Sequence, residues 1–458
     1  MNKSPLVVIN IVGLTPSLLG EYTPNLNRLI DDSFMASAGG IFPAVTTTAQ
    51  AGMVTGKTAS DHGIVGNGWY FRDLAEVMFW KQSNHLVHGQ KVWDDLKSTN
   101  ENFRVSKLFW WYNMYANVDF SMTPRPHYPA DGSKVMDLYS WPKGLHQSIE
   151  GKIGQFPFFN FWGPKAGIES SDWIAKAAAL EFDQNKPSLQ FVYLPHLDYN
   201  LQRLGPNDPQ IFLDVAAIDK VVGQLIDHVK SRGAEVMVVS EYGIEAVDTP
   251  IGVNQILREN GYIEVRESLD WELLDTGASK AFAVADHQVA HIYVQCQDDI
   301  SKVKQLLEKV PGIERVLDEK GKEAFGIQHD NAGDLVAIAD KGAWFTYYYW
   351  LDDSKAPDFA RTVDIHRKPG YDPVELFVDP DIKFPQLKVA GKVLKKKLGF
   401  RMLMDVIPIK PELVKGSHGR LISHSDEGPL LILPKHLAGD DYSLFDVAGL
   451  IKQYFYSS

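Results

Sequence analysis

Three adjacent threonines, Thr46 to Thr48, form the first group of residues that could carry chemistry. They precede a stretch from Ala49 to Thr55 that the pattern predicts to be a helix closed by Gly56. A hydroxyl at a helix N-terminus gains from the helix dipole, which favours its alkoxide and also favours a bound phosphate. Taken alone, this stretch favours a simpler interpretation, an ordinary threonine N-cap.

Two more polar groups follow apolar segments that are typical of buried strands. Asp198 comes shortly after residues 189–194, and Glu241 directly follows residues 235–240. Between these strands, residues 209–229 carry apolar side chains at helical spacing, a pattern that favours a parallel sheet with right-handed crossovers. Because ligands of such sheets gather at the carboxyl ends of the strands, we expect both acids and the threonines to meet there.

The composition is that of an ordinary globular protein. The 458 residues are 45% hydrophobic and 23% charged, enough for one large or two interleaved domains. A net charge of -12 argues against general nucleic-acid binding, which needs a basic face. Cys296 is the single cysteine, and the apolar run from Leu6 to Val12 is too short for a transmembrane helix. We therefore expect a cytoplasmic protein with no membrane segment; the sequence does not indicate its oligomeric state.

Changes in pattern along the chain predict its division into domains. Residues 1–253 are expected to form an α/β core, with an insertion at about 100–185 that is rich in Trp, Tyr, Pro and Gly. Short strands and helices mix over 254–398, which predicts a smaller α+β cap subdomain, and 399–458 return to the core. Lys392 to Lys397 form a basic cluster that we interpret as a solvated helix face.

Four motifs, in their order and spacing, resemble the type I phosphodiesterase / nucleotide pyrophosphatase family of the alkaline phosphatase superfamily. In the first, the threonines are followed by Thr55-Gly56 and by residues 62–67. The resemblance places the family's nucleophile on Thr46, leaves Thr47 as a neighbouring substrate-binding candidate, and places the asparagine that holds a phosphoryl oxygen on Asn67. It implies an alkaline-phosphatase-like three-layer α/β sandwich with a mainly parallel central sheet and an inserted cap.

The other three motifs carry the metal ligands that the resemblance implies. Asp198 precedes Gly205-Pro206 in register with the family pattern, and Glu241 stands in a segment similar to Ser-Asp-His-Gly. His418, in Gly-Ser-His-Gly, matches a late histidine ligand of the family. The resemblance therefore predicts metal ligands at Asp198, Glu241 and His418.

Four expected ligands differ from the family pattern. Val12 and Gln202 stand where the family has Asp and His, and Glu241 and Tyr242 replace another Asp and His. Asn10, two residues before Val12, lies on the same strand face and is a neutral oxygen donor. A standard zinc pair with three or four ligands per ion is hard to build from this set.

Other segments offer replacement donors, although hydrogen-bonded structural groups explain them equally well. Asp286 and His287 precede a predicted strand, and Asp364 and His366 share one side of an extended segment. Oxygen-rich donors would suit Mn, Mg or Ca better than a zinc pair, while a single zinc on His418 stays open. Four further side chains are substrate-binding candidates, the two aromatic ones with core packing as the alternative: Trp69, Tyr70, Arg367 and Lys368.

The sequence thus predicts a metal-dependent hydrolase of phosphodiesters or nucleotide pyrophosphates. Thr46 would attack phosphorus to give a phosphothreonine, and Asn67 would donate to a phosphoryl oxygen. The partner would be a phosphate-ester small molecule such as a nucleotide, and the divalent metal could be Zn, Mn, Mg or Ca, in unknown number. A phosphomonoester or phosphonate hydrolase is the nearest alternative. A catalytically inactive relative that binds an anion or a protein is the alternative from another class.

Overall fold

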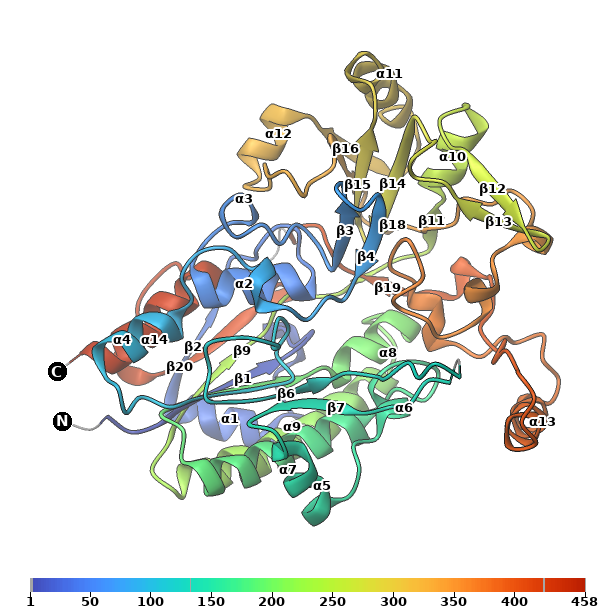
Figure 1. Ribbon diagram of the computed structural model, residues 1–458. Coiled ribbons are helices and arrows are strands. Elements are labelled where there is room, and N and C mark those ends of the chain that lie inside the picture. Colours follow the sequence, from blue (N-terminus) through green and yellow to red (C-terminus); the bar gives the residue numbers. More distant parts are fainter. Residues whose placement is uncertain (1–2, 132, 423–424, 458) are drawn as a thin grey trace.

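The centre of the protein is an eight-stranded sheet whose five middle strands run parallel (Figure 1). The computed structural model describes residues 3–131, 133–422 and 425–457. Antiparallel pairs close both edges of the sheet. In spatial order the strands are β2 (Ser33–Ser37), β20 (Leu430–Pro434), β9 (Glu235–Val239), β1 (Leu6–Ile11), β8 (Leu189–Leu194), β5 (Val105–Leu108), β6 (Phe120–Pro124) and β7 (Leu138–Trp141).

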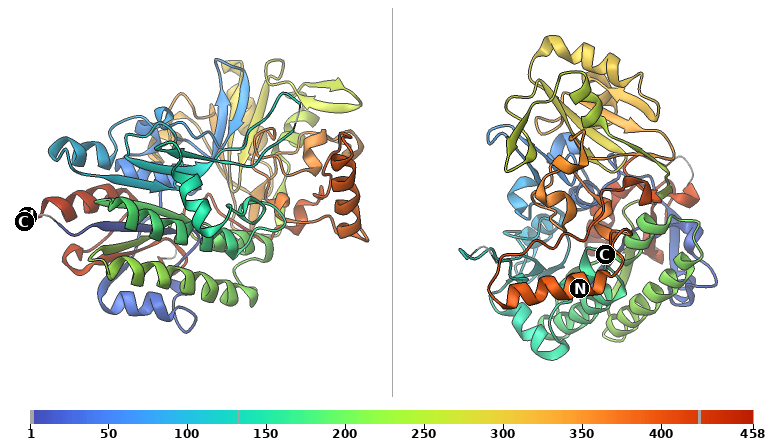
Figure 2. Two further views of the ribbon diagram at one scale, coloured as in Figure 1. Left: turned by 60° about the horizontal axis from the view of Figure 1, so that its bottom comes forward. Right: turned by 90° about the vertical axis from the view of Figure 1, so that its right-hand side faces the viewer.

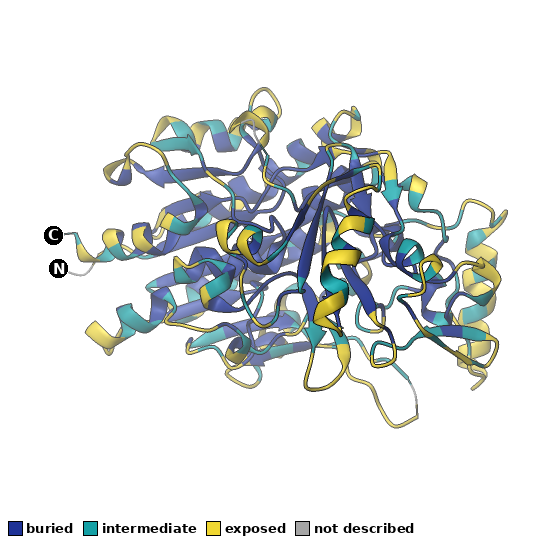
Figure 3. Cartoon of the chain, turned by 90° about the horizontal axis from the view of Figure 1, so that it is seen from above, coloured by how far each residue is buried: buried dark blue, intermediate teal, exposed yellow. Residues whose placement is uncertain are grey.

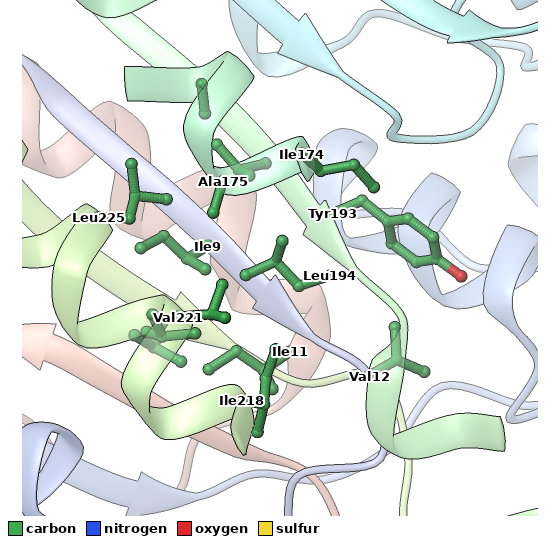
Figure 4. Close-up of a cluster of buried hydrophobic side chains, with 14 of the residues drawn as sticks. Ile9, Ile11, Val12, Ile174, Ala175, Tyr193, Leu194, Ile218, Val221 and Leu225 are labelled. Carbon is green, nitrogen blue, oxygen red and sulfur yellow. The ribbon is translucent and has the colours of Figure 1, made fainter. Parts of the chain in front are cut away.

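Helices cover both faces of this sheet, so the predicted three-layer α/β sandwich is confirmed. Side chains of β1 alternate between the two faces, as the strand period requires: Ile9 packs in one core cluster and Val8 in the other. Figure 4 shows the first cluster, where Ile9 and Leu194 meet Ile218 and Val221. One face carries α1 (Pro24–Asp31), α5 (Leu145–Ile153), α7 (Ile168–Asn185) and α9 (Gln210–Lys230); the other carries α2 (Thr46–Thr55), α4 (Val92–Thr99) and α14 (Val447–Tyr456).

A second, antiparallel sheet lies beyond the carboxyl edge of the first, towards the top of Figure 1. Its four strands are β14 (Ala281–Asp286), β15 (Val289–Val294), β17 (Leu335–Ala339) and β16 (Ile313–Leu317). Helices α10 (Val253–Glu259), α11 (Gln297–Leu307) and α12 (Glu319–Ala324) accompany it. The hairpin of β3 (Gly68–Phe71) and β4 (Glu76–Phe79) leaves the N-terminal part of the chain and packs against β14.

The remaining elements are short ladders and helices outside these two sheets. Three small two-stranded ladders join β10 (Glu245–Ala246) to β19 (Gly416–Ser417), β11 (Thr249–Ile251) to β18 (Ala343–Phe345), and β12 (Val265–Ser268) to β13 (Trp271–Leu274). The other helices are α3 (Ala59–His62), α6 (Phe158–Phe161), α8 (His196–Leu204) and α13 (Pro385–Lys397). Seen from above, the strands are mostly buried, and the helices around them carry both buried and exposed residues (Figure 3). Within the described ranges, no helix has the length and apolar character needed to cross a bilayer.

Candidate active site

Residues from four distant parts of the chain line one cavity at the carboxyl edge of the central sheet. Thr46 begins α2, Asp198 lies in the first turn of α8 just after β8, and Tyr242 and His418 follow β9 and β19. The cavity has a volume of about 150 Å³, a size at which an apolar cavity can take a benzene ring. The structure therefore brings together Thr46, Asp198 and His418, as the motifs predicted, and adds the phenol of Tyr242.

Thr46 is the first residue of α2, and its hydroxyl is not an N-cap. The N-cap position is Val45, which has an extended backbone, and no side chain caps the helix. The interpretation of the threonines as an ordinary cap is therefore wrong. Thr47 is turned away, because its hydroxyl donates to the Gly66 carbonyl at 2.7 Å. Of these two threonines, Thr46 alone lines the cavity.

A chain of hydrogen bonds connects the Thr46 hydroxyl with the Asp198 carboxyl. The Thr46 Oγ1 and Tyr242 Oη atoms lie 2.9 Å apart, and the Tyr242 hydroxyl lies 3.4 Å from Asp198 Oδ1. On its other side, Asp198 Oδ2 accepts from Gln202 Nε2 at 2.7 Å, and the Tyr371 hydroxyl donates to Gln202 Oε1 at 3.0 Å. The carboxyl is thus held in one orientation, facing the phenol that contacts Thr46.

Four rings stacked on one another form a wall of the cavity. The ring of His418 lies 3.7 Å from that of Tyr242 and 3.7 Å from that of His287, which in turn stacks on Tyr371 at 3.7 Å. His418 Nδ1 is 2.7 Å from the Ala44 carbonyl, which can only accept, so this nitrogen carries the proton. Nε2 of His418 is then an acceptor, 3.8 Å from Asp198 Oδ1. Burial lowers the pKa of both histidines well below the usual range, so both are neutral.

A close approach of backbones positions His418 in this wall. A Cβ on Gly416 would lie 2.0 Å from the carbonyl oxygen of Leu201, so only glycine allows β19 to pack against α8. The strand that precedes His418 therefore reaches the helix that carries Asp198. Replacement of this glycine would separate the two side chains.

Glu241 lies beside this chain and is held by amide groups. Its Oε1 accepts from Asn10 Nδ2 and from Gln50 Nε2, both at 2.6 Å, while Oε2 is buried without a partner. Burial raises the pKa of the Glu241 carboxyl to about 8 and that of Asp198 to about 7. At neutral pH, Glu241 is therefore mainly protonated, and Asp198 is partly protonated and partly ionised.

Substitution of Glu241 by glutamine is expected to stabilise the protein at neutral and alkaline pH. The pKa of Glu241 is about 8 in the folded protein, above its value of 4.5 in the unfolded chain. The contribution of Glu241 to the free energy of unfolding is therefore fully present below pH 4.5 and is lost as the pH rises towards 8. At pH 7 the loss is roughly 3 kcal/mol, and a glutamine oxygen could still accept from Asn10 and Gln50. Urea unfolding of the parent protein and of Glu241→Gln at pH 5 and pH 8 measures this difference. The increase in the free energy of unfolding on substitution should be larger at pH 8. A gain that is equal at both values would contradict the burial of an ionisable acid here.

Asn67 connects the cap to the start of α2. Its backbone nitrogen and side-chain Nδ2 donate to the two carboxyl oxygens of Asp286, at 2.7 and 3.1 Å, and its Oδ1 accepts from the Thr47 nitrogen at 3.1 Å. Asp286 also contacts His287 Nδ1 at 2.7 Å. Asn67 and Asp286 are not among the residues that line the cavity. The observed contact positions Asn67 against Asp286, and the roles of Asn67 as a phosphoryl donor and of Asp286 as a metal ligand stay predictions.

The donor set does not fit the pair of divalent metals that the family resemblance implies. The phenol of Tyr242 lies between Thr46 and Asp198, and the amide nitrogen of Gln202 faces Asp198 at the predicted position of a histidine ligand. Glu241 is held by two amide donors. Throughout residues 3–131, 133–422 and 425–457, no three His, Cys, Asp or Glu side chains are grouped so that they could hold a metal ion.

The outer part of the cavity is lined mainly by aromatic rings. Trp80 lies 4.8 Å from Trp111 and 6.1 Å from Tyr371, and Trp162 lies 5.7 Å from Tyr371, measured between ring centroids. The aromatic-rich insertion supplies Trp111 and Trp162. Its composition could have indicated an aromatic lining, but composition does not show which aromatic residues reach the cavity. Other lining residues come from the segment after β6, from α6 and from the cap: Arg125, Lys134, Met136, Phe158, Phe161, Val363, Ile365 and His366.

The predicted aromatic contacts of the hairpin β3–β4 lie elsewhere. Trp69 is buried and stacks on Phe71 at 5.1 Å, and Tyr70 packs edge-on against Phe282 at 5.0 Å. Neither residue lines the cavity. Both pack where the hairpin meets the four-stranded sheet, as the alternative of structural packing predicts.

The charged segment 364–368 is also largely structural. Lys368 is buried in an ion-pair triad with Asp372 and Glu375, each at 2.7 Å, and exposed Arg367 pairs with Asp358. Of this segment, His366 and Ile365 line the cavity, whereas Asp364, Arg367 and Lys368 do not. The predicted metal pair and the predicted phosphate cations therefore do not assemble here, because these charges neutralise one another within the cap.

The central sheet, the buried hydroxyl at the start of α2 and the cavity above the strand ends define an alkaline-phosphatase-like hydrolase fold. Two solved structures cover 99% of the chain at 13% identity. One is a murine ectonucleotide pyrophosphatase / phosphodiesterase 5, in an inactive form with AMP, covered to 95% with a TM-score of 0.59. The other is phosphonoacetate hydrolase from Sinorhizobium meliloti with phosphonoformate, covered to 96% with a TM-score of 0.63.

Sequence comparison identifies the family. The sequence model of the type I phosphodiesterase / nucleotide pyrophosphatase family matches residues 6–372. The chain belongs to this family of hydrolases. An uncharacterized pyrophosphatase/phosphodiesterase of Schizosaccharomyces pombe is 24% identical over 258 residues, which are 53% of the chain and 45% of that relative. The match thus spans about half the length of the curated relative.

Proposed function

We propose that the protein hydrolyses a phosphodiester or nucleotide pyrophosphate by nucleophilic attack of Thr46 on phosphorus. The observation that carries this proposal is the hydrogen-bonded chain from Thr46 through Tyr242 to Asp198, all three of which line one cavity. A phosphomonoester or phosphonate is the second substrate class. It is favoured by the likeness to a phosphonoacetate hydrolase, whose structure holds a phosphonate.

The first step transfers the phosphoryl group to Thr46. The Thr46 oxygen forms a bond to phosphorus, its proton passes to Tyr242, and the phenol proton passes to the Asp198 carboxylate. The bond from phosphorus to the leaving oxygen breaks, and that oxygen takes a proton from water. The N-terminus of α2, where Thr46 stands, stabilises the negative charge that develops on the phosphoryl oxygens.

The second step releases a phosphate monoester from the threonine adduct, or inorganic phosphate where the substrate is a monoester. Water attacks phosphorus, and the unprotonated Nε2 of His418 accepts its proton. The Thr46 oxygen leaves and recovers its proton from Asp198 through Tyr242, and His418 gives its proton to solvent, which restores the starting state. No step is assigned to a metal ion, because Tyr242 and Gln202 fill the positions of two expected ligands.

The walls of the cavity favour a substrate with an apolar or aromatic leaving group. Trp80, Trp111, Trp162 and Tyr371 offer ring faces or edges close to Thr46, and a flat leaving group could stack on them. A nucleotide base has such a face, which is consistent with the family's nucleotide substrates.

Turnover by chelator-treated protein tests this proposal. We expect p-nitrophenol release from bis-p-nitrophenyl phosphate, from p-nitrophenyl phenylphosphonate, or from both, to survive EDTA and to be unchanged by added Zn, Mn, Mg or Ca. Turnover that appears only with an added metal would restore metal dependence. Tight binding of AMP without turnover of any substrate would instead favour a non-catalytic binding module. The replacement of expected metal ligands is the reason to consider this alternative.

A further inference from the structure

Helix α13 projects from the rest of the protein and buries none of its residues. It stands apart from both sheets in Figure 1 and along one side of the molecule in Figure 2. Its large apolar side chains are nevertheless exposed: Leu387 to 70%, Leu394 to 57% and Leu398 to 64%, with Phe384 and Phe400 at its two ends exposed to 67% and 65%. Apolar side chains gathered in this way mark an interaction surface rather than single exposed residues.

The same segment is strongly basic within an acidic protein. Residues 383–401 hold seven cationic side chains and no acidic one, whereas the whole chain has a net charge of -12. The seven are Lys383, Lys388, Lys392, Lys395, Lys396, Lys397 and Arg401. A partner for this surface must therefore accept both an apolar helix face and a dense positive charge.

The apolar and the basic side chains of α13 lie on different faces of the helix. Leu387, Leu394 and Leu398 follow helical spacing and lie on one face, while Lys388 and Lys392 lie on another. These two lysines pair with Asp405 of the returning chain, at 3.2 and 2.6 Å. Both pairs tie the lysine face to the body of the protein and leave the leucine face directed outward.

The segment after β6, part of which lines the candidate active site, lies within range of the charge on Lys396 of α13. The pKa of the Asp131 carboxyl in this segment is lowered, first by hydrogen bonds from Ser133 and also by the positive charge of Lys396 in the helix. Arg125, Lys134 and Met136 of the same segment line the cavity. The same segment also exposes Tyr128 to 59% and Val135 to 49%.

We propose that residues 383–403 dock the protein on an anionic lipid surface, with α13 lying in the plane of the interface. Leucine and phenylalanine side chains enter the boundary between headgroups and acyl chains, and the lysines contact anionic headgroups. Charge complementarity selects this occupant over the same surface of a second copy, which presents the like charges of Lys395, Lys396 and Lys397. The proposal does not depend on the identity of the reaction at Thr46.

Co-sedimentation of the full-length protein with vesicles tests the proposal. Vesicles of phosphatidylcholine with about a third phosphatidylglycerol are compared with pure phosphatidylcholine at low salt. Substitution of Lys395, Lys396 and Lys397 by glutamine should weaken binding to the anionic vesicles on the order of a hundredfold, from about 1 kcal/mol per lysine. Leu394→Glu should weaken it at least about tenfold, because a buried leucine becomes a charge.

A matched control separates this effect from a general change of charge. Leu213 on α9 is exposed to 59%, close to the 57% of Leu394, so Leu213→Glu makes the same change on another helix. This control should bind anionic vesicles as the parent protein does. Absence of binding, equal binding to neutral vesicles, or equal loss in both glutamate variants would overturn the proposal. Self-association that Leu394→Glu abolishes, without any vesicle binding, would assign the surface to a second copy instead.

Discussion

Replacement of Thr46 by alanine is expected to lower kcat/KM by a factor on the order of a thousand or more, because it removes the attacking oxygen. The fold should persist: the Thr46 side chain makes one hydrogen bond, to Tyr242, and α2 does not depend on it for a cap. Initial rates with bis-p-nitrophenyl phosphate, alongside thermal unfolding, measure both quantities. Thr46→Ser, which keeps a hydroxyl, should retain a substantial part of the activity.

Thr47 provides the matched control for this substitution. Its hydroxyl donates to the Gly66 carbonyl behind the cavity, so Thr47→Ser keeps that bond and should keep the activity within about tenfold. An alanine variant of Thr46 that retains parental activity would show that another group attacks phosphorus. A larger loss in the Thr47 variant than in the Thr46 variant would exchange the roles of the two residues.

Substitution of Asp198 by asparagine is expected to lower kcat by a factor on the order of a hundred to a thousand, because it removes the proton acceptor of the chain. The pH profile is the more specific readout. Asp198 must be ionised to accept a proton, so the rate of the parent protein should rise about tenfold per pH unit below its pKa of about 7 and level off above it. The residual rate of Asp198→Asn should lack this inflection.

Two further variants separate Asp198 from its neighbours. Tyr242→Phe keeps the ring that stacks on His418 but removes the hydroxyl between Thr46 and Asp198, so the rate should fall without loss of the fold. Glu241→Gln should leave the inflection near pH 7 in place, because Glu241 titrates at about 8. An inflection that persists in Asp198→Asn and disappears in Glu241→Gln would assign the base to Glu241.

Much of the core and part of the site could be predicted from the sequence. Buried parallel strands have continuous apolar sequences, and so the segments of β8 and β9 were recognisable, together with the position of Asp198 and Glu241 at their ends. The spacing of motifs then aligned Thr46 and His418 with them. The position of each of these residues follows from the local sequence pattern and from one rule, that the carboxyl ends of parallel strands meet at one edge of a sheet.

What the sequence did not predict depends on contacts between distant segments. Tyr371 donates to Gln202 across 169 residues, and Tyr242 lies between Thr46 and Asp198 although these are far apart along the chain. Spacing says nothing about such contacts. Lys368 is an example of the reverse error: a cation next to a predicted site is typical of phosphate binding, yet two nearby acids neutralise it in the interior.

The most direct test of the central claim is rapid acid quenching of chelator-treated protein during turnover of bis-p-nitrophenyl phosphate, followed by peptide mass spectrometry. We expect a phosphoryl group carrying one nitrophenyl ester, or the phosphate left after its loss, on Thr46 in the presence of EDTA. Turnover with no modified Thr46, modification of another residue, or modification that requires an added divalent metal would contradict it.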